Sequence, residues 1–181
     1  MHMLLSTFES EMWTPQYIEL WERIERHNFE PVQRLNFLGR LARDHNWTLI
    51  EARAAVEAYR RFCFLATVSS SPMTPSEAVD EVWHQHLIYS RDYWDIWCGQ
   101  VLRKVLHHDP TPGGAEAQIR YRWQYAQTLA LHEQFFGPPP AKLWPATHVR
   151  FGAGRRNKIT DLMSSVVVTR RVIALRNLFL K

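Results

Sequence analysis

Two stretches of the sequence place histidines next to acidic side chains. One reads Val79-Asp80-Glu81-Val82-Trp83-His84-Gln85-His86-Leu87, and the other is His107-His108-Asp109. Imidazole is a common ligand for zinc, iron, nickel and copper, and carboxylates accompany it in many such sites. An ion with an open position for water would suit hydrolysis or, with iron, oxidation. The candidate metal ligands, for zinc or iron, are therefore Asp80, His84, His86 and His108, with His107 and Asp109 as further members.

Helical geometry argues against one site that holds all of these groups. Residues two apart on an α-helix point about 200° apart, so His84 and His86 face different sides. Asp80 lies one turn before His84 and could accept its ring N–H, as in a metal site or an ordinary surface pair. In an antiparallel hairpin, His108 would lie about 24 Å from His86. One ion could join them only if the helices splay or the loop at Asp109 folds back.

A purely structural reading of the histidines stays open at this stage. Wrapped on a helix, His86 shares a face with Val82 and Trp83, so it could be a buried residue with a hydrogen-bond partner. His107 and His108 would lie near a helix C-terminus, where positive charge is favourable by about 0.3–1 kcal/mol.

Capping residues, prolines and apolar spacing predict helices along most of the chain. Thr14-Pro15 begins the first, and Thr48 with Glu51 forms a capping box. Thr74-Pro75-Ser76-Glu77 predicts a second capping box, and Ser90 could cap the helix after it. The expected helices cover about 15–26, 31–44, 49–68, 75–87, 91–106 and 115–136. The sequence thus predicts an all-α fold, a single bundle of roughly five or six helices.

Composition limits the class of protein. The chain has 181 residues, of which 46% are apolar, enough for one domain with a real core. Cys63 and Cys98 form no CxxC motif, and the first ten residues lack the basic and apolar regions of a signal peptide. No uncharged apolar run reaches about 18 residues. We therefore expect a cytoplasmic protein with both thiols reduced.

The C-terminal part of the chain is strongly basic. Residues 141–181 hold nine Lys/Arg and one acid, a net charge of +8, whereas the preceding 140 residues carry −4. We expect a helical domain over 1–145 and a basic extension over 146–181, whose segment 162–180 we predict to be helical, although its valine run at 166–168 would also fit a strand. The candidate contact residues are Arg150, Arg155, Arg156, Lys158, Arg170 and Arg171. Such a surface could contact nucleic acid, an anionic membrane or an acidic partner, or simply be solvated.

The histidine region resembles the glycine-rich domain-containing protein-like family. The resemblance rests on Pro75-Ser76, on Val79 to His86, and on Tyr93, Cys98-Gly99 and Leu106-His107-His108, and it extends over about residues 50–145. It implies a helical domain and marks Asp80, Trp83, His84, His86 and His108 as its defining positions. It implies no reaction, and this chain has no glycine-rich region.

Other chemistry is weakly indicated. Glu81 and His84 form only one of the two Glu-x-x-His motifs that ferritin-like di-iron bundles require, and the spacing predicts that Cys98 is a buried, inert thiol. The aromatic series of residues 83–97 and 121–125 has the spacing of core residues. The first functional hypothesis is therefore a non-enzymatic protein-interaction module. The alternatives are a metal-binding protein or metalloenzyme, and contact with nucleic acid or a membrane surface through the basic extension.

Overall fold

The computed structural model describes residues 12–30 and 36–152, and these residues form an all-α fold without strands. The helices are α2 (Pro15–Arg26), α3 (Phe37–His45), α4 (Leu49–Val68), α5 (Glu77–Ile88), the π-helix η1 (Asp92–Leu102), α6 (Gly114–Phe136) and α7 (Thr147–Arg150). Contacts group the described residues into two units that separate between Thr147 and His148. All the helices up to α6 lie in the first unit.

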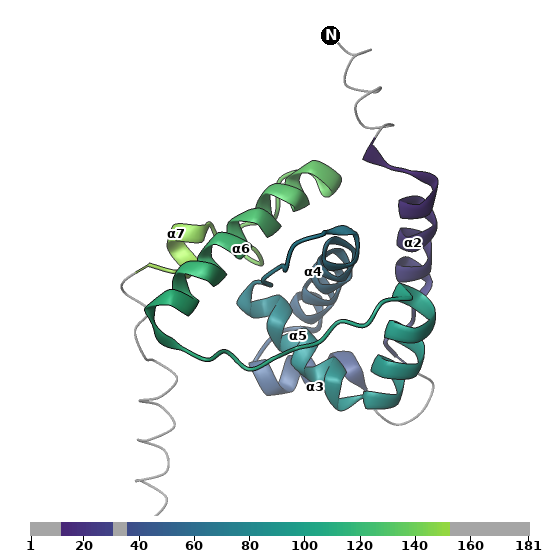
Figure 1. Cartoon of the computed structure of the whole chain (residues 1–181). Helices are drawn as coiled ribbons and strands as arrows, with labels where there is room; N and C mark the ends of the chain where they lie inside the picture. Colours follow the sequence, from purple (N-terminus) through teal and green to yellow (C-terminus); the bar gives the residue numbers. More distant parts are fainter. Residues whose placement is uncertain (1–11, 31–35, 153–181) are drawn as a thin grey trace, which may run out of the picture. The chain divides into compact units, whose positions relative to one another are not determined.

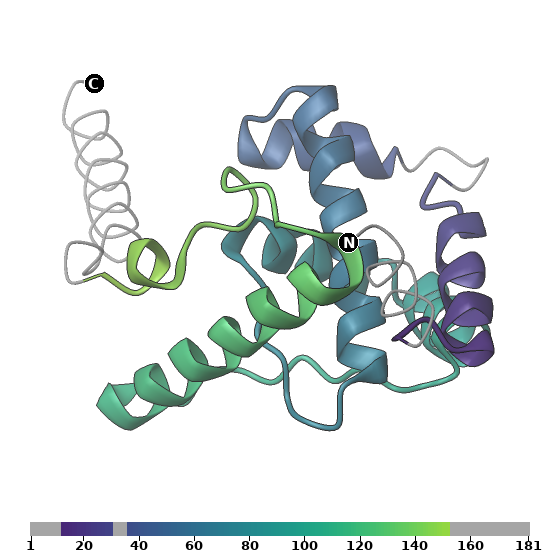
Figure 2. The same ribbon diagram turned by 90° about the horizontal axis from the view of Figure 1, so that it is seen from above.

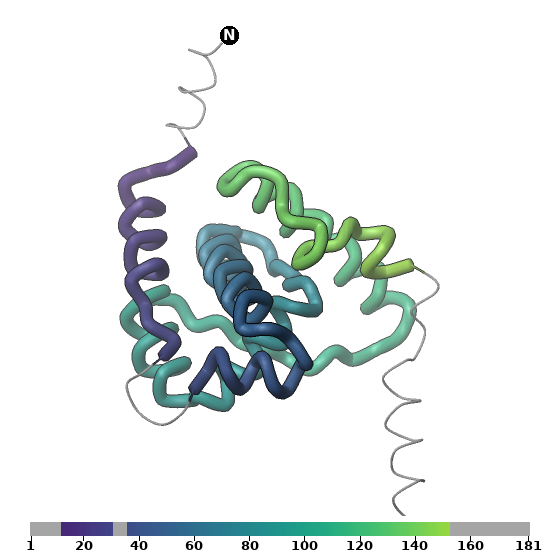
Figure 3. The backbone as a smooth tube through the Cα atoms, turned by 180° about the vertical axis from the view of Figure 1, so that it is seen from behind, coloured from purple at the N-terminus to yellow at the C-terminus, as the bar shows by residue number. Residues whose placement is uncertain are grey.

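Helix α4 is the centre of the first unit. It packs against α2, α3, α5, α6 and η1, and Figure 1 shows these helices arranged around it. Its composition explains this position, because half of its residues are buried, among them Tyr59, Phe62, Cys63, Phe64 and Leu65. A helix that is apolar on most sides is stable only when other elements cover it. Figure 3 shows the backbone from the opposite side, and α4 again lies between the other helices.

Local sequence signals explain most helix ends. Thr14 accepts a hydrogen bond from the Tyr17 amide and begins α2, and the capping box of Thr48 and Glu51 begins α4. The predicted helix over 31–44 begins later, at Phe37, because Asn36 caps it; residues 31–35 lie outside the described residues. The predicted capping box at residues 74–77 is wrong. Ser76 caps α5 through the Val79 amide, whereas the Thr74 hydroxyl donates to Gln124 on α6.

The predicted α-helix over 91–106 is instead the shorter π-helix η1, and Ser90 does not cap it. Hydrogen bonds from residue i to i+5 widen each turn, so residues four and five apart share a face. This explains why the buried residues of η1 are Tyr93, Trp97, Cys98, Val101 and Leu102. The helix ends at Leu102, where Arg103 takes the left-handed conformation.

The segment 103–113 has no regular secondary structure and leads from η1 to α6. It crosses α5 on its way (Figure 1), and it carries His107 and His108. These histidines therefore do not lie at a helix C-terminus, as the sequence suggested. The loop at Asp109 folds back toward α5, which was one of the two conditions for bringing His108 near the other histidines.

Helix α6 packs against the other helices of the first unit mainly through its second half. Figure 2 shows its first half extending away from α4, and in 114–124 only Ala117 is buried. Ile119 and Trp123 are exposed there, and Trp94 on η1 is exposed as well, so the aromatic series is only partly core. Within the described residues no helix is long and apolar enough to cross a membrane.

Candidate metal centre

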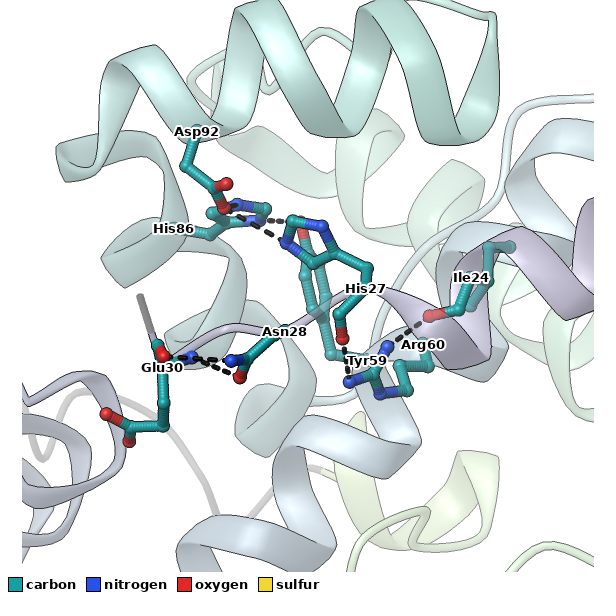
Figure 4. A network of polar contacts seen from close by, with 8 residues as sticks. All are labelled: Ile24, His27, Asn28, Glu30, Tyr59, Arg60, His86 and Asp92. Carbon is teal, nitrogen blue, oxygen red and sulfur yellow. Dashed lines mark hydrogen bonds and ion pairs between the residues drawn. The ribbon is translucent and has the colours of Figure 1, made fainter. Parts of the chain in front are cut away.

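Three side chains from three parts of the chain meet at one carboxylate oxygen. The Nε2 atom of His27 lies 3.1 Å from Oδ2 of Asp92, and Nε2 of His86 lies 2.8 Å from the same oxygen. Figure 4 shows both imidazole rings pointing toward Asp92. His27 follows α2, His86 is in the last turn of α5, and Asp92 is the first residue of η1. Their ligand atoms all lie within 4.8 Å of one another.

The backbone around His27 is held by a buried arginine. Arg60 on α4 donates from Nη1 to the Ile24 carbonyl and from Nη2 to the His27 carbonyl, the latter at 2.6 Å (Figure 4). These are carbonyls that the end of α2 leaves without partners inside the helix. Asn28 and Glu30 then form a turn through two 2.9 Å hydrogen bonds. The position of His27 is therefore fixed from α4 and from the turn that follows it.

The orientation of His86 is fixed by Tyr59. The Tyr59 hydroxyl lies 3.0 Å from Nδ1 of His86, so both ring nitrogens of this fully buried histidine have partners. Burial lowers the pKa of His86, although its hydrogen bond to Asp92 acts in the opposite direction. Burial also raises the pKa of Tyr59, which keeps its hydroxyl protonated. His86 is therefore neutral near pH 7, and it donates from Nε2 to Asp92 while Nδ1 accepts from Tyr59.

Asp92 supplies the negative charge of this group. Burial would raise the pKa of its carboxyl, but hydrogen bonds from His27 and His86 outweigh that effect and hold the pKa well below its usual value. Its side chain is 24% exposed, compared with 5% for His27 and 0% for His86. Asp92 is therefore the most solvent-accessible of the three side chains.

This geometry fits a transition-metal ion. Nitrogen and oxygen ligands about 2.1 Å from an ion are about 3.0 Å apart at right angles and about 3.4 Å apart in a tetrahedron. The observed separations of 3.1 and 2.8 Å are close to the first value. Two histidines and one carboxylate on one side of an ion form the ligand set of many iron and zinc sites. The bond between Tyr59 and His86 supplies the outer contact that orients a ligand histidine.

A second group of possible ligands lies at the surface. Asp80 and His84 from α5 meet His108 from the segment 103–113, with their ligand atoms also within 4.8 Å of one another. Nε2 of His108 lies 2.8 Å from Oδ1 of Asp80, so His108, and not His84, is the hydrogen-bond partner of Asp80. That hydrogen bond raises the pKa of His108.

The structure thus divides the residues that the sequence proposed as one ligand set. Asp80, His84 and His108 come together, whereas His86 belongs to the buried group. His107 and Asp109 are exposed and lie in neither group. Sequence reasoning missed His27 and Asp92. Asp92 is six positions after His86, but a break between helices hides the relation, and His27 is 59 positions before His86.

The remaining predicted residues have simpler surroundings. Cys63 and Cys98 are buried and not bonded to each other, and burial raises the pKa of both thiols, as expected for inert cysteines. Of the basic extension, Arg150 places its guanidinium 5.0 Å from the ring centre of Phe151. Arg155, Arg156, Lys158, Arg170 and Arg171 lie outside the described residues, as does the segment 162–180.

Comparison with known proteins identifies a family but not an activity. The family model described as UCP032817-like matches residues 21–130, a range that includes all six residues of the two groups. Curated proteins and solved structures gave no match to the chain. The resemblance to the glycine-rich domain-containing protein-like family stays a prediction, because the matching model has a different description. Since the match covers more than half of the 181 residues, the chain belongs to the UCP032817-like family.

Proposed function

We propose that this protein binds a divalent transition-metal ion, zinc or iron, through His27 Nε2, His86 Nε2 and Asp92 Oδ2. One observation carries the proposal: two histidine nitrogens, one from the residue after α2 and one from α5, converge on one carboxylate oxygen at 3.1 and 2.8 Å. The three ligand atoms lie within 4.8 Å of one another before any ion is added, so the rings need only turn from the carboxylate oxygen toward the ion for it to bind.

The protonation states of the group suit metal binding. His86 is held neutral by its burial, and Asp92 is held ionised by its two histidine partners. For Nε2 of His86 to bind an ion, its proton must move to Nδ1. The Tyr59 hydroxyl, 3.0 Å from Nδ1, can then accept that hydrogen instead of donating its own. The site therefore accommodates both tautomers of His86.

Three protein ligands leave at least one further position on the ion. In metalloproteins that position commonly holds water or substrate, and zinc lowers the pKa of such a water to about 7. Here it would face the Asp92 side, where the side chain is 24% exposed. Two histidines, one carboxylate and an open position are the ligand set of many catalytic zinc and iron centres.

Metal analysis of the full-length, untagged chain tests the proposal. Asp92→Asn removes the charged ligand with little change of shape, and Asp95→Asn is the matched control on the exposed side of the same helix. We expect the wild type and Asp95→Asn to retain one more equivalent of zinc or iron than Asp92→Asn. Equal metal content in the three proteins, after incubation with either ion, would overturn the proposal.

A protein-interaction module is the second candidate function, favoured by the exposed apolar residues of α6. Ile119 is 71% and Trp123 56% exposed, and they lie four positions apart, on one face of the helix. Exchange of both for glutamate should abolish capture of a protein partner without a change in unfolding free energy. An unchanged set of captured proteins would exclude this face. Contact with nucleic acid or membrane through the basic extension, and a cytoplasmic location, also stay predictions.

A further inference from the structure

The surface group of Asp80, His84 and His108 has metal-ligand geometry of its own. Besides the 2.8 Å contact of His108 with Asp80, the ring centres of His84 and His108 are 4.4 Å apart, with 49° between their planes. The Trp83 ring lies 4.6 Å from the His108 ring and approaches it nearly at right angles, which restricts the orientation of that imidazole. Two imidazoles and one carboxylate therefore lie close enough to share an ion.

This group is open to solvent, unlike the buried one. The side chain of His84 is 51% exposed, that of Asp80 32% and that of His108 19%. A further carboxylate lies beside it, since Oε2 of Glu81 is 3.9 Å from Nδ1 of His84 and 3.8 Å from Nε2 of His45. An ion could enter directly from solution, and its remaining positions would be filled by water or by Glu81.

Two of the three side chains belong to a helix, and the third belongs to a segment without regular secondary structure. Asp80 and His84 are one turn apart on α5, whereas His108 belongs to the segment 103–113. That segment is attached before His108, where Lys104 donates to the Ala66 and Thr67 carbonyls and Leu106 accepts from Tyr93. After His108, residues 109–116 are all exposed. His108 is thus the last residue of the segment that the body of the protein holds.

We propose that Asp80, His84 and His108 bind a second divalent transition-metal ion, which fastens the segment 103–113 to helix α5. The ion would replace a single half-exposed hydrogen bond by three coordinate bonds, and so fix the point from which the chain continues into α6. The proposal does not depend on the buried centre, because the two groups share no residue.

Metal titration of the full-length chain, stripped with a chelator, tests the site. Zn²⁺ and Co²⁺ are the probes, and cobalt reports its coordination through its visible absorption. His84→Ala removes an exposed ligand and should leave the fold intact; His107→Ala removes an exposed neighbour of the site. We expect His84→Ala to lose one equivalent, or to bind it at least tenfold more weakly, and His107→Ala to match the wild type. Equal binding by His84→Ala and wild type would overturn the proposal.

Hydrogen exchange of residues 103–113 tests the fastening. We expect added Zn²⁺ to slow exchange in the wild type and in His107→Ala, but not in His84→Ala. Binding at this site without slower exchange would overturn the fastening role. The same measurement on Asp92→Asn separates the two proposals: slower exchange on zinc addition in that variant supports the surface site whether or not the buried centre binds metal.

Discussion

Nε2 of His108 lies 2.8 Å from Oδ1 of Asp80, although 28 positions separate the two residues. This contact exists because η1 ends at Leu102 and the following segment turns back across α5. It brings His108 from one histidine-containing stretch of the sequence to Asp80 and His84 in the other. In the absence of an ion, it is also the polar contact that holds His108 to α5.

Asp80→Asn should weaken that attachment in chelator-treated protein. The pair is half-exposed, and such ion pairs contribute about 0.2–1 kcal/mol. We expect a loss of unfolding free energy in that range by urea denaturation, with Asp95→Asn, on an exposed carboxylate of η1, as the control. A loss well above that range would show that Asp80 has a further role in the fold.

Tyr59→Phe should weaken metal binding without removing a ligand. The variant keeps the buried ring but deprives Nδ1 of His86 of its partner, and changes of this kind typically reduce metal affinity 10–100-fold. Competition with a chromophoric chelator would measure the loss. Tyr125→Phe is the matched control, because it also removes the hydroxyl of a fully buried ring, one that donates to the Pro145 carbonyl. Equal affinities of the two variants would contradict the role of Tyr59.

Arg60→Lys should destabilise the protein although the positive charge is kept. A lysine is a point charge and cannot reproduce the planar fork that reaches the Ile24 and His27 carbonyls together. Hydrogen bonds to charged groups contribute about 1.5–3 kcal/mol, so loss of one should lower the unfolding free energy by about that amount. Arg53→Lys, at an exposed position of the same helix, should have little effect. A stable Arg60→Lys variant would show that the end of α2 is held by other contacts.

His132 should make the stability of the protein depend on pH. Its Nδ1 donates to the Gly137 carbonyl, and its Nε2 is buried without a partner among the described residues. Burial lowers its pKa below 6.5, and Gly137 opposes this only in part. The unfolded chain therefore binds the proton more readily, so this contribution is complete above pH 6.5 and is lost as the pH falls below it.

His132→Asn removes this titration while it keeps a donor for Gly137. We expect the difference in unfolding free energy between wild type and variant to shrink as the pH is lowered from 8 to 5. Urea denaturation at several pH values, in the presence of a chelator, would measure it. A constant difference over that range would show that His132 does not titrate as its surroundings indicate.

Local signals predicted the helices well where a side chain acts on its own backbone. Thr14 and Thr48 cap the helices that were expected, because their contacts lie within a few residues. Thr74 shows the limit of such reasoning. It has the sequence of a helix cap, but its hydroxyl binds Gln124, 50 positions away, and Ser76 becomes the cap. A contact across the fold overrides the local preference, and the sequence alone does not reveal it.

The two groups of candidate ligands were likewise predictable only where their residues are neighbours in the sequence. Asp80 and His84 are neighbours on one helix, and the sequence identified them together with His108. The spacing of Tyr93, Trp97 and Val101, four residues each, fits both an α-helix and a π-helix. The sequence therefore did not reveal that η1 ends at Leu102, nor that the segment after it brings His108 back to α5. The buried group depends on how α2 packs, which brings His27 to residues far away in the chain.

The position of His27 has a kinetic consequence. Two of the three proposed ligands, His86 and Asp92, lie close together in the chain, whereas the third, His27, follows α2, whose end is bound to Arg60 through the Ile24 and His27 carbonyls. Local opening of α2 would withdraw one ligand and leave the other two in place. The rate at which a bound ion exchanges with solution would then follow the detachment of one short helix, and Arg60 would set the residence time of a metal that it never touches.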